Sequence, residues 1–509
     1  MLKDKLLVLF LIVFTINAVA QKVGNLTPQW RPVYHFSPPT NWMNDPNGLI
    51  FLNGEFNLFY QHNPFENKWG HMSWGHATSK DLVNWNNLPV AIPEVVTKDT
   101  TTWIYSGSTV LDVNNTSGFG INGKGPLVAI FTADQPKQKK ESQFIAYSND
   151  NGLTFKFYAH NPVIDLNKKD FRDPNVFWYE PTKQWIMTVA MVDEHMVRIY
   201  GSRNLKEWTK LSDFGPAGFI RNGWECPSLL PLTVDNEPAN IKWALFVSSG
   251  GDHGPLMQYF VGDFDGINFK NNNPSKKVLT VDYGDAFYAA IAWRDAPGKK
   301  PILLGWLQNG KPETWPWKGQ MSIPHDLSLK TTSEGLILIQ TPSSIVREAL
   351  SKYAKGRMLS RKNIRLNDRN RIISKDNYFD GNANWIEAEL QINESKKTGF
   401  ILTEKNGTTK KVIVGYDAVG QKLYVDCTGS ESQNKSHENL IQSAPMKPVN
   451  GIITIQILLD KSSLEVFGNG GQRVISTMIY PDKDATGISI FSEGNAIIRS
   501  LKMWDLNSK

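Results

Sequence analysis

The sequence predicts an all-β protein in which a β-propeller of about five blades precedes a β-sandwich. Two observations lead to this fold class. First, helical periodicity is scarce after residue 20, and short runs rich in Val, Ile, Phe, Tyr and Trp are separated by Asn, Gly, Asp and Pro, as in chains made of β-hairpins. The runs at 49–51 and 56–60, on either side of Asn53-Gly54, form one such pair. Second, a turn motif recurs along the first two thirds of the chain.

The recurring motif joins a polar turn to an aromatic residue that could fill the space between sheets. It occurs at 79–85, 148–155 and 202–208, and more loosely at 263–269. The spacing of roughly 50 to 70 residues suits one four-stranded propeller blade with long loops. Residues 30–342 would then hold about five blades. The alternative is that such turns recur by coincidence in an ordinary sandwich.

The character of the sequence changes after residue 342. Residues 343–375 are rich in charged and polar side chains, as expected of a linker or a helical crossover between domains. Alternating strand patterns return in 376–509, for example at 385–392 and 451–459. This second domain is predicted to be a β-sandwich.

The first 20 residues are predicted to be a signal peptide. Lys3 and Lys5 precede an apolar run at 6–16, and Ala18 and Ala20 provide the small residues of a cleavage site. An uncleaved anchor is the alternative, but the apolar run is short for a bilayer span. We therefore expect cleavage near Ala20 and an exported, periplasmic or secreted protein without a membrane span.

Composition restricts the remaining classes of function. The net charge is +6, but Lys and Arg are scattered rather than gathered in the basic helix or arm that binds nucleic acid. Cys226 and Cys427 are the only cysteines, too few for a disulfide scaffold or a multi-cysteine metal site. His62, His71 and His76 match no usual ligand spacing. We expect no metal, no cofactor and no nucleic-acid partner, and we predict a monomer.

Three acidic residues stand beside prolines in aromatic surroundings. Asp45 and Asp173 directly precede a proline, and Glu225 is followed by Cys and then Pro. Each is expected where a tight turn meets a strand, which fixes the direction of the carboxyl group. In a propeller, such positions on different blades converge on a central pit. Two carboxyl groups meeting there suit glycoside cleavage, which needs one protonated acid and one ionised carboxylate.

The motifs around these acids are WMNDPNG at 42–48, RDP at 172–174 and WECP at 224–227. In order and separation they resemble the signature motifs of glycoside hydrolase family 32, which contains the invertases, inulinases and levanases. LDKSSLEVF at 459–467 resembles that family's sandwich-domain signature, so the resemblance covers nearly all of the mature chain. It implies a five-bladed propeller, a sandwich, and a β-fructosidase acting on fructans, fructo-oligosaccharides or sucrose.

The resemblance also implies roles for individual residues. Asp45 would be the nucleophile of a retaining mechanism, forming a covalent fructosyl-enzyme, and Glu225 would be the general acid/base. Asp173 would hold fructosyl hydroxyls. The carboxyl groups of Asp45 and Glu225 would stand about 5 to 6 Å apart. The residues expected to contact the substrate are Asn44, Gln61, Trp69, Tyr105, Ser106, Arg172, Cys226 and Trp306.

Two other functions remain open on this sequence. A fructosyltransferase would use the same two carboxylates, with a sugar hydroxyl in place of water. A non-catalytic fructan-binding protein belongs to a different class, although it has no need of a protonated acid over the scissile oxygen. Residues 285–293 also depart from the family's usual pattern, so the outer part of the pit, where chain-length and linkage preference are decided, is not fixed by the resemblance.

Overall fold

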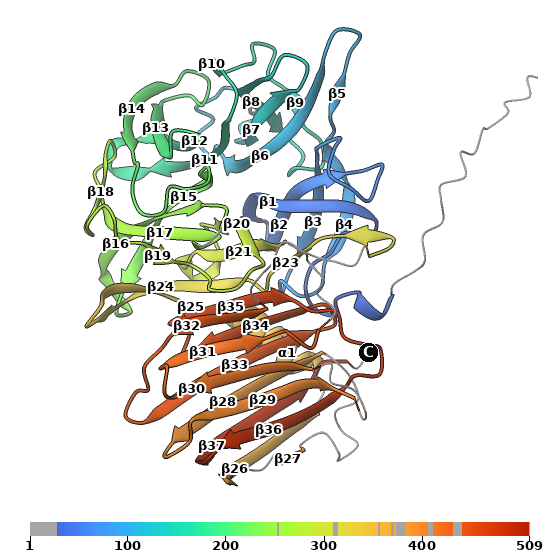
Figure 1. Cartoon of the computed structure of the whole chain (residues 1–509). Coiled ribbons are helices and arrows are strands. Elements are labelled where there is room, and N and C mark those ends of the chain that lie inside the picture. The colour runs from blue at the N-terminus through green and yellow to red at the C-terminus, as the bar shows by residue number, and fades with distance from the viewer. Residues whose placement is uncertain are drawn as a thin grey trace, which may run out of the picture.

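In the computed structural model of the chain, almost all of the regular secondary structure is β-strand, and the strands form two domains (Figure 1). It describes residues 28–251, 254–308, 314–354, 357–367, 371–372, 383–405, 411–430 and 440–507. The predicted signal peptide, residues 1–20, lies outside the described residues.

The first domain is a five-bladed propeller, as predicted. Blade one contains β1 (Asn41–Leu52), β2 (Glu55–Asn63), β3 (Ser73–Ser79) and β4 (Asn86–Ile92). Blade two contains β6 (Thr101–Leu111), β7 (Leu127–Gln135) and β8 (Lys140–Ser148), extended by β5 (Val95–Val96), β9 (Lys156–Phe157) and β10 (Ile164–Lys168). Blade three contains β11 (Phe171–Tyr179), β12 (Gln184–Met191), β13 (Met196–Ser202) and β14 (Thr209–Phe214).

Blades four and five share one continuous sheet. Blade four contains β15 (Glu225–Val234), β16 (Glu237–Ser248), β17 (Met257–Phe264), β18 (Phe269–Asn271) and β19 (Leu279–Thr280). Blade five contains β20 (Phe287–Trp293), β21 (Ile302–Leu307), β23 (Gln320–Met321), β24 (His325–Thr332) and β25 (Gly335–Pro342). A single parallel pair, Val234 with Leu329, joins the two blades.

The five first strands form the inner ring of the propeller. β1, β6, β11, β15 and β20 each contact the next in order, and β20 contacts β1, so the ring is complete. β22 (Trp317–Lys318), which lies between β21 and β23 of blade five in the sequence, pairs in parallel with the start of β1. Blade five is thus tied to blade one, and the ring presents one central pit.

The recurring polar motif forms the turn after the third strand in each of blades one to four. In blade one, Ser79 Oγ accepts the N–H of Leu82. In blade two, Ser148 Oγ accepts the N–H of Gly152. The motif was therefore a valid marker of blades, because a short polar side chain satisfies backbone donors at a turn that every blade must make.

The second domain is a sandwich of two six-stranded sheets. One has the order β26-β37-β28-β33-β34-β35 and the other β27-β36-β29-β30-β31-β32. The strands are β26 (Met358–Asn367), β27 (Arg371–Ile372), β28 (Asn384–Ile392), β29 (Lys397–Glu404), β30 (Val412–Asp417), β31 (Lys422–Asp426), β32 (Ile441–Pro445), β33 (Ile452–Asp460), β34 (Ser463–Gly468), β35 (Arg473–Met478), β36 (Gly487–Glu493) and β37 (Asn495–Asp505). Buried side chains of both sheets form the core between them.

The range expected to be a linker, 343–375, carries more structure than a linker. It begins with α1 (Ser344–Tyr353), whose first turn is capped by Ser343. It then contains β26 and β27, which belong to the two sandwich sheets. The sequence concealed β26 because it is an edge strand with mostly exposed residues, and Lys and Arg are well suited to an exposed edge.

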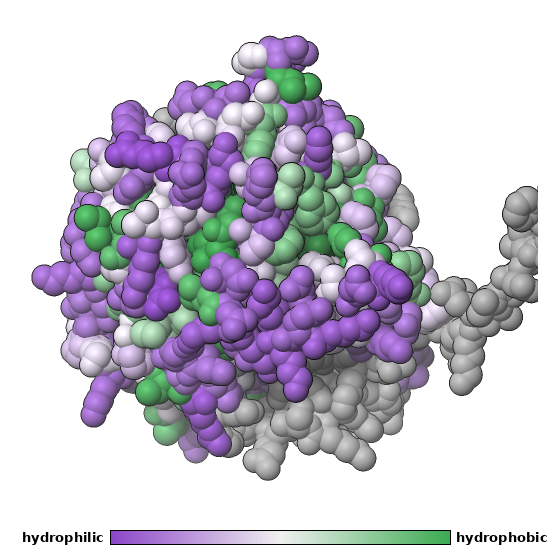
Figure 2. Space-filling view, turned by 90° about the horizontal axis from the view of Figure 1, so that it is seen from above, coloured by the Kyte–Doolittle hydropathy of each residue, from purple (hydrophilic) through white to green (hydrophobic). Residues whose placement is uncertain are grey.

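The two domains share a hydrophobic core. Val346 and Leu350 of α1 lie in the same buried cluster as Trp293 of blade five and Trp385 and Phe467 of the sandwich. No helix among the described residues is long and apolar enough to cross a membrane. Seen from above in Figure 2, the surface is mostly hydrophilic, and its hydrophobic residues occur in small groups.

Candidate active site

All five inner strands have a β-bulge at the same level of the pit. In each blade, three residues along the inner strand face only two on the second strand; the bulges follow Met43, Ile104, Arg172, Glu225 and Tyr288. Bulges redirect side chains out of the regular alternation of a strand. The residues at or just after the bulges therefore point together into the pit, although they come from five separate stretches of sequence.

The expected tight turn at 42–48 is in fact part of the continuous strand β1. Two successive bulges lie in it, one after Met43 and one after Asn47. Gly48 has a positive φ of 52°, which glycine adopts without steric cost. The same residue types serve bulges and turns, so the sequence indicated a kink correctly but not its kind.

Asp45 and Asp173 lie on either side of the Cys226 thiol. Cys226 Sγ is 3.7 Å from Asp45 Oδ2 and 3.5 Å from Asp173 Oδ2, and the backbone N–H of Cys226 donates to Asp173 Oδ2 at 2.8 Å. Burial raises the pKa of Cys226 well above its usual value, and the neighbouring carboxylates raise it further. The thiol therefore stays protonated, and its single S–H can donate to either carboxylate.

Asp45 is partly exposed at the surface of the pit. Burial of its carboxyl group raises the pKa of Asp45. Two hydrogen bonds lower this pKa, because hydrogen bonds to a carboxylate favour its charged form. Ser106 Oγ donates to Asp45 Oδ2 at 2.6 Å, and Asn44 Nδ2 donates to Asp45 Oδ1 at 3.1 Å. The Asn44 amide is held in turn by the indole N–H of Trp42, which donates to Asn44 Oδ1 at 2.8 Å.

Asp173 lies deeper, with 6% of its surface exposed. Burial raises the pKa of Asp173, the charge of Glu225 raises it further, and Arg172 opposes both. Its φ of 64° is in the left-handed region, which aspartate tolerates better than most residues. Asp173 therefore forms the floor of the pit below the two more exposed acids.

Glu225 is held by one donor on each oxygen. Arg172 Nη1 donates to Oε1 at 2.9 Å, and the hydroxyl of Tyr288 donates to Oε2 at 2.8 Å. The other side of the Arg172 guanidinium is bound by Glu141, whose side chain is 2% exposed. Arg172 also donates to Asp170, so it is fixed among three carboxylates, and it fixes Glu225 in place.

The remaining predicted contacts surround this group at different depths. Gln61 is buried and donates to the backbone oxygen of Ile104, so it supports the bulge of β6. The Tyr105 ring lies beside the Arg172 guanidinium, at 5.8 Å. Trp69 is 50% exposed and contacts Tyr105. The Trp306 ring centroid lies 6.1 Å from that of Trp42, and the Trp306 indole nitrogen has no hydrogen-bond partner among the described residues.

Two residues of the site were not predicted from the sequence. Tyr288 occupies in blade five the position that Glu225 occupies in blade four, directly before the bulge. Glu141 lies opposite Asp134 in the pairing of β7 and β8. Two acids facing each other on adjacent strands repel, which could have signalled that a cation, here Arg172, lies near them.

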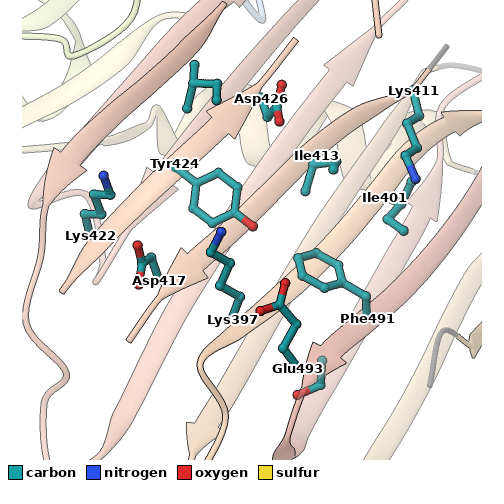
Figure 3. Close-up of a pocket in the computed structure, with 12 residues that line it drawn as sticks. Lys397, Ile401, Lys411, Ile413, Asp417, Lys422, Tyr424, Asp426, Phe491 and Glu493 are labelled. Carbon is teal, nitrogen blue, oxygen red and sulfur yellow. The ribbon is translucent and has the colours of Figure 1, made fainter. Parts of the chain in front are cut away.

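A second hollow lies on the outer face of the sandwich, on the sheet that contains β29, β30, β31 and β36 (Figure 3). Charged side chains such as Lys397, Asp417 and Glu493 surround Tyr424 and Phe491 there. Tyr424 and Phe491 are each only 9% exposed, so neither presents an open ring face to a sugar. Among the described residues, the pit is thus the better candidate for the chemistry.

The pit combines features that cleavage of a polar substrate requires. Carboxyl groups in different hydrogen-bonding environments can divide the roles of acid and nucleophile. The rings of Tyr105, Trp69 and Trp306 supply apolar walls, and Asn44 and Ser106 supply fixed polar groups. Both cysteines of the chain are free and buried.

Comparison with known proteins identifies the family. The family models for the N-terminal and C-terminal domains of glycosyl hydrolases family 32 match residues 35–342 and 351–505. A levanase of Bacillus subtilis is 42% identical to the chain, over 99% of the chain and 74% of the levanase. An extracellular exo-inulinase of Aspergillus ficuum is 35% identical, over 93% of each sequence. Among solved structures, the exo-inulinase of Aspergillus awamori has a TM-score of 0.86 at 32% identity, covering 95% of this chain and all of that one. The chain therefore belongs to glycoside hydrolase family 32.

Proposed function

We propose that the protein is an exported retaining β-fructosidase, which hydrolyses fructosyl linkages in fructans, fructo-oligosaccharides or sucrose. The observation that carries this proposal is the pair Asp45 and Glu225. Asp45 receives hydrogen bonds from Ser106 and Asn44, whereas Glu225 is oriented by Arg172 and Tyr288. The names of the relatives, levanase and extracellular exo-inulinase, support a fructan substrate and export.

The reaction takes place in two displacements. Asp45 attacks C2 of the fructosyl unit while Glu225 gives its proton to the leaving oxygen, so the C2–O bond breaks and a fructosyl-enzyme ester forms. Glu225, now ionised, takes a proton from water, which attacks C2 and releases Asp45. Asp173, at the floor of the pit, binds fructosyl hydroxyls and favours the transition state.

The proposal is tested by incubating the purified protein with levan, inulin and sucrose separately. Free fructose is expected from at least one of them, and methanol added to the reaction should give the methyl β-fructofuranoside, because double displacement retains configuration. The α-anomer would overturn the retaining mechanism. Oligosaccharides longer than the substrate at high sucrose concentration would indicate a fructosyltransferase, and absence of any turnover would indicate a binding protein.

Replacing Ser106 by alanine is expected to make the enzyme less active at acidic pH. The Ser106 hydroxyl lowers the pKa of Asp45, against burial, which raises it. Without this donor the pKa of Asp45 rises, so a smaller fraction is ionised at a given acidic pH. The acid limb of the profile of kcat/KM against pH should therefore move to higher pH. Ser351→Ala on the exposed side of α1 is the control, and an unmoved acid limb in the Ser106 variant would contradict the role of Asp45.

A further inference from the structure

A path of aromatic contacts leads outward from Glu225 to the surface. Arg172, which donates to Glu225, faces the Tyr105 ring. The Tyr105 ring centroid is 6.3 Å from that of Trp69, and the Trp69 centroid is 5.2 Å from that of Trp103. The path thus begins at the proposed acid/base and leaves the pit between blades one and two.

Beyond Trp103 the path continues to an exposed ring. The His71 ring lies 6.4 Å from Trp103 and 5.3 Å from Phe65. Phe65 is 55% exposed and Trp69 50% exposed, and they are the most exposed aromatic side chains among the described residues. We call the rings of Trp69, Trp103 and Phe65 the aromatic shelf.

The loop that carries the shelf is held in a fixed conformation. The side chain of Asn63, which is fully buried, accepts the N–H groups of Phe65 and Glu66 and donates to the backbone oxygen of Lys68. His71 Nδ1 lies 2.8 Å from Glu94 Oε1, and this contact ties the loop to the segment between β4 and β5. The exposed rings are therefore presented without the entropic cost of ordering a mobile loop on binding.

We propose that the aromatic shelf binds the sugar units beyond the cleaved bond, on the leaving-group side of a fructan chain. The inference rests on the proposed function, because Glu225 as general acid must face the leaving oxygen, and the path to the shelf starts at the arginine that holds Glu225 and passes through Tyr105. Exposed, rigid aromatic rings offer apolar faces to the C–H side of a sugar. Sucrose has only one sugar unit on that side, whereas a longer chain extends further along the path, of which Phe65 is the last ring. The shelf is thus a determinant of chain-length preference.

The test compares Phe65→Ala with wild-type enzyme on sucrose and on the long-chain fructan that the wild type cleaves. Phe65→Ala is expected to lower kcat/KM on the long chain about five- to tenfold, mainly through a higher KM, and to leave sucrose hydrolysis unchanged. Phe65→Tyr, which keeps the ring, should restore most of the long-chain value. Ile267→Ala, a similarly exposed apolar residue on blade four, is the matched control and should alter neither substrate.

The outcomes separate the shelf from the proposed function. Equal losses on both substrates, or an unchanged KM for the long chain, would overturn the role of the shelf while leaving the fructosidase activity in place. If the wild-type enzyme releases no fructose from any substrate, the proposed function itself fails.

Discussion

Asp45→Asn is expected to reduce kcat by about 10⁴-fold or more while sugar binding is retained. Asparagine has nearly the same shape as aspartate, and one amide oxygen can still accept the hydrogen bond from Ser106. It cannot form the ester with C2, so the first displacement is blocked. The measurement is fructose release under saturating substrate, together with calorimetric titration of a fructan oligosaccharide.

The control for this variant is Asp263→Asn, which changes an exposed aspartate that pairs with Lys242 on blade four. It should leave both kcat and binding unchanged. If Asp45→Asn keeps more than about one tenth of the wild-type kcat, Asp45 is not the nucleophile, and the double displacement must be abandoned. Loss of both turnover and binding, with the fold intact, would instead assign Asp45 to substrate recognition.

The sequence predicted the fold well because its signals are local. The polar turn after the third strand depends on residues within a few positions of each other, as Ser79 with Leu82 shows, so it can be recognised without knowing the partner strands. The acids at 45, 173 and 225 were found for the same reason, since each stands beside a proline in a short motif.

What the sequence did not predict depends on distant pairing. Tyr288 lies in the stretch that departs from the family's usual pattern, which assigned it no role, and it meets Glu225 only because both precede a bulge at the same level of neighbouring inner strands. Glu141 of blade two accepts a hydrogen bond from Arg172 of blade three. The stretch at 459–467 was recognised by resemblance, but its partner His35 lies more than 400 residues away, near the start of the described chain. The register of the strands and the closure of the propeller decide these contacts, and the residues alone do not reveal them in the sequence.

The stretch at 459–467 places two carboxylates in the interface between the domains. Glu465 accepts from His35 Nε2 at 2.8 Å and from the backbone N–H of Ile323 at 2.7 Å, and His325 lies 3.2 Å from its other oxygen. Asp460 faces the other nitrogen of His35 at 2.9 Å and also accepts the N–H groups of residues 33 and 34. The side chains of His35, His325, Asp460 and Glu465 are fully buried.

Glu465→Gln is expected to lower the free energy of unfolding by about 3 to 5 kcal/mol, because it removes one partner of a buried charge cluster. The histidine nitrogen that donates to Glu465 would face an amide of similar shape without its charge. The measurement is urea unfolding at pH 6. Glu389→Gln, at an exposed position on the sandwich strand β28, is the control and should change stability by less than about 0.5 kcal/mol. Since Glu465 is not among the residues that contact the carboxylates of the pit, kcat of the folded variant should remain near that of the wild type.

The same cluster predicts how stability depends on pH. Burial lowers the pKa of His35, but the hydrogen bonds and charges of Asp460 and Glu465 outweigh it and raise the pKa to about 9. A raised histidine pKa stabilises the fold fully below the unfolded value of about 6.5, and this stabilisation of about 3 kcal/mol is lost as pH rises from 6.5 through 9.

Glu465 contributes with the opposite pH dependence. Burial raises the pKa of Glu465, but its bonds to His325 and His35 lower it to about 2. The stabilisation from Glu465 is therefore complete above about pH 4.3 and is lost as pH falls through 2. The stabilisation that His35 and Glu465 together contribute should therefore be greatest between about pH 4.5 and 6.5. The stability of Glu465→Gln should decline less steeply than that of the wild type from pH 6.5 to 9, because His35 then has only one anionic partner. Equal slopes for the two proteins over that range would show that His35 is not charged in the folded state.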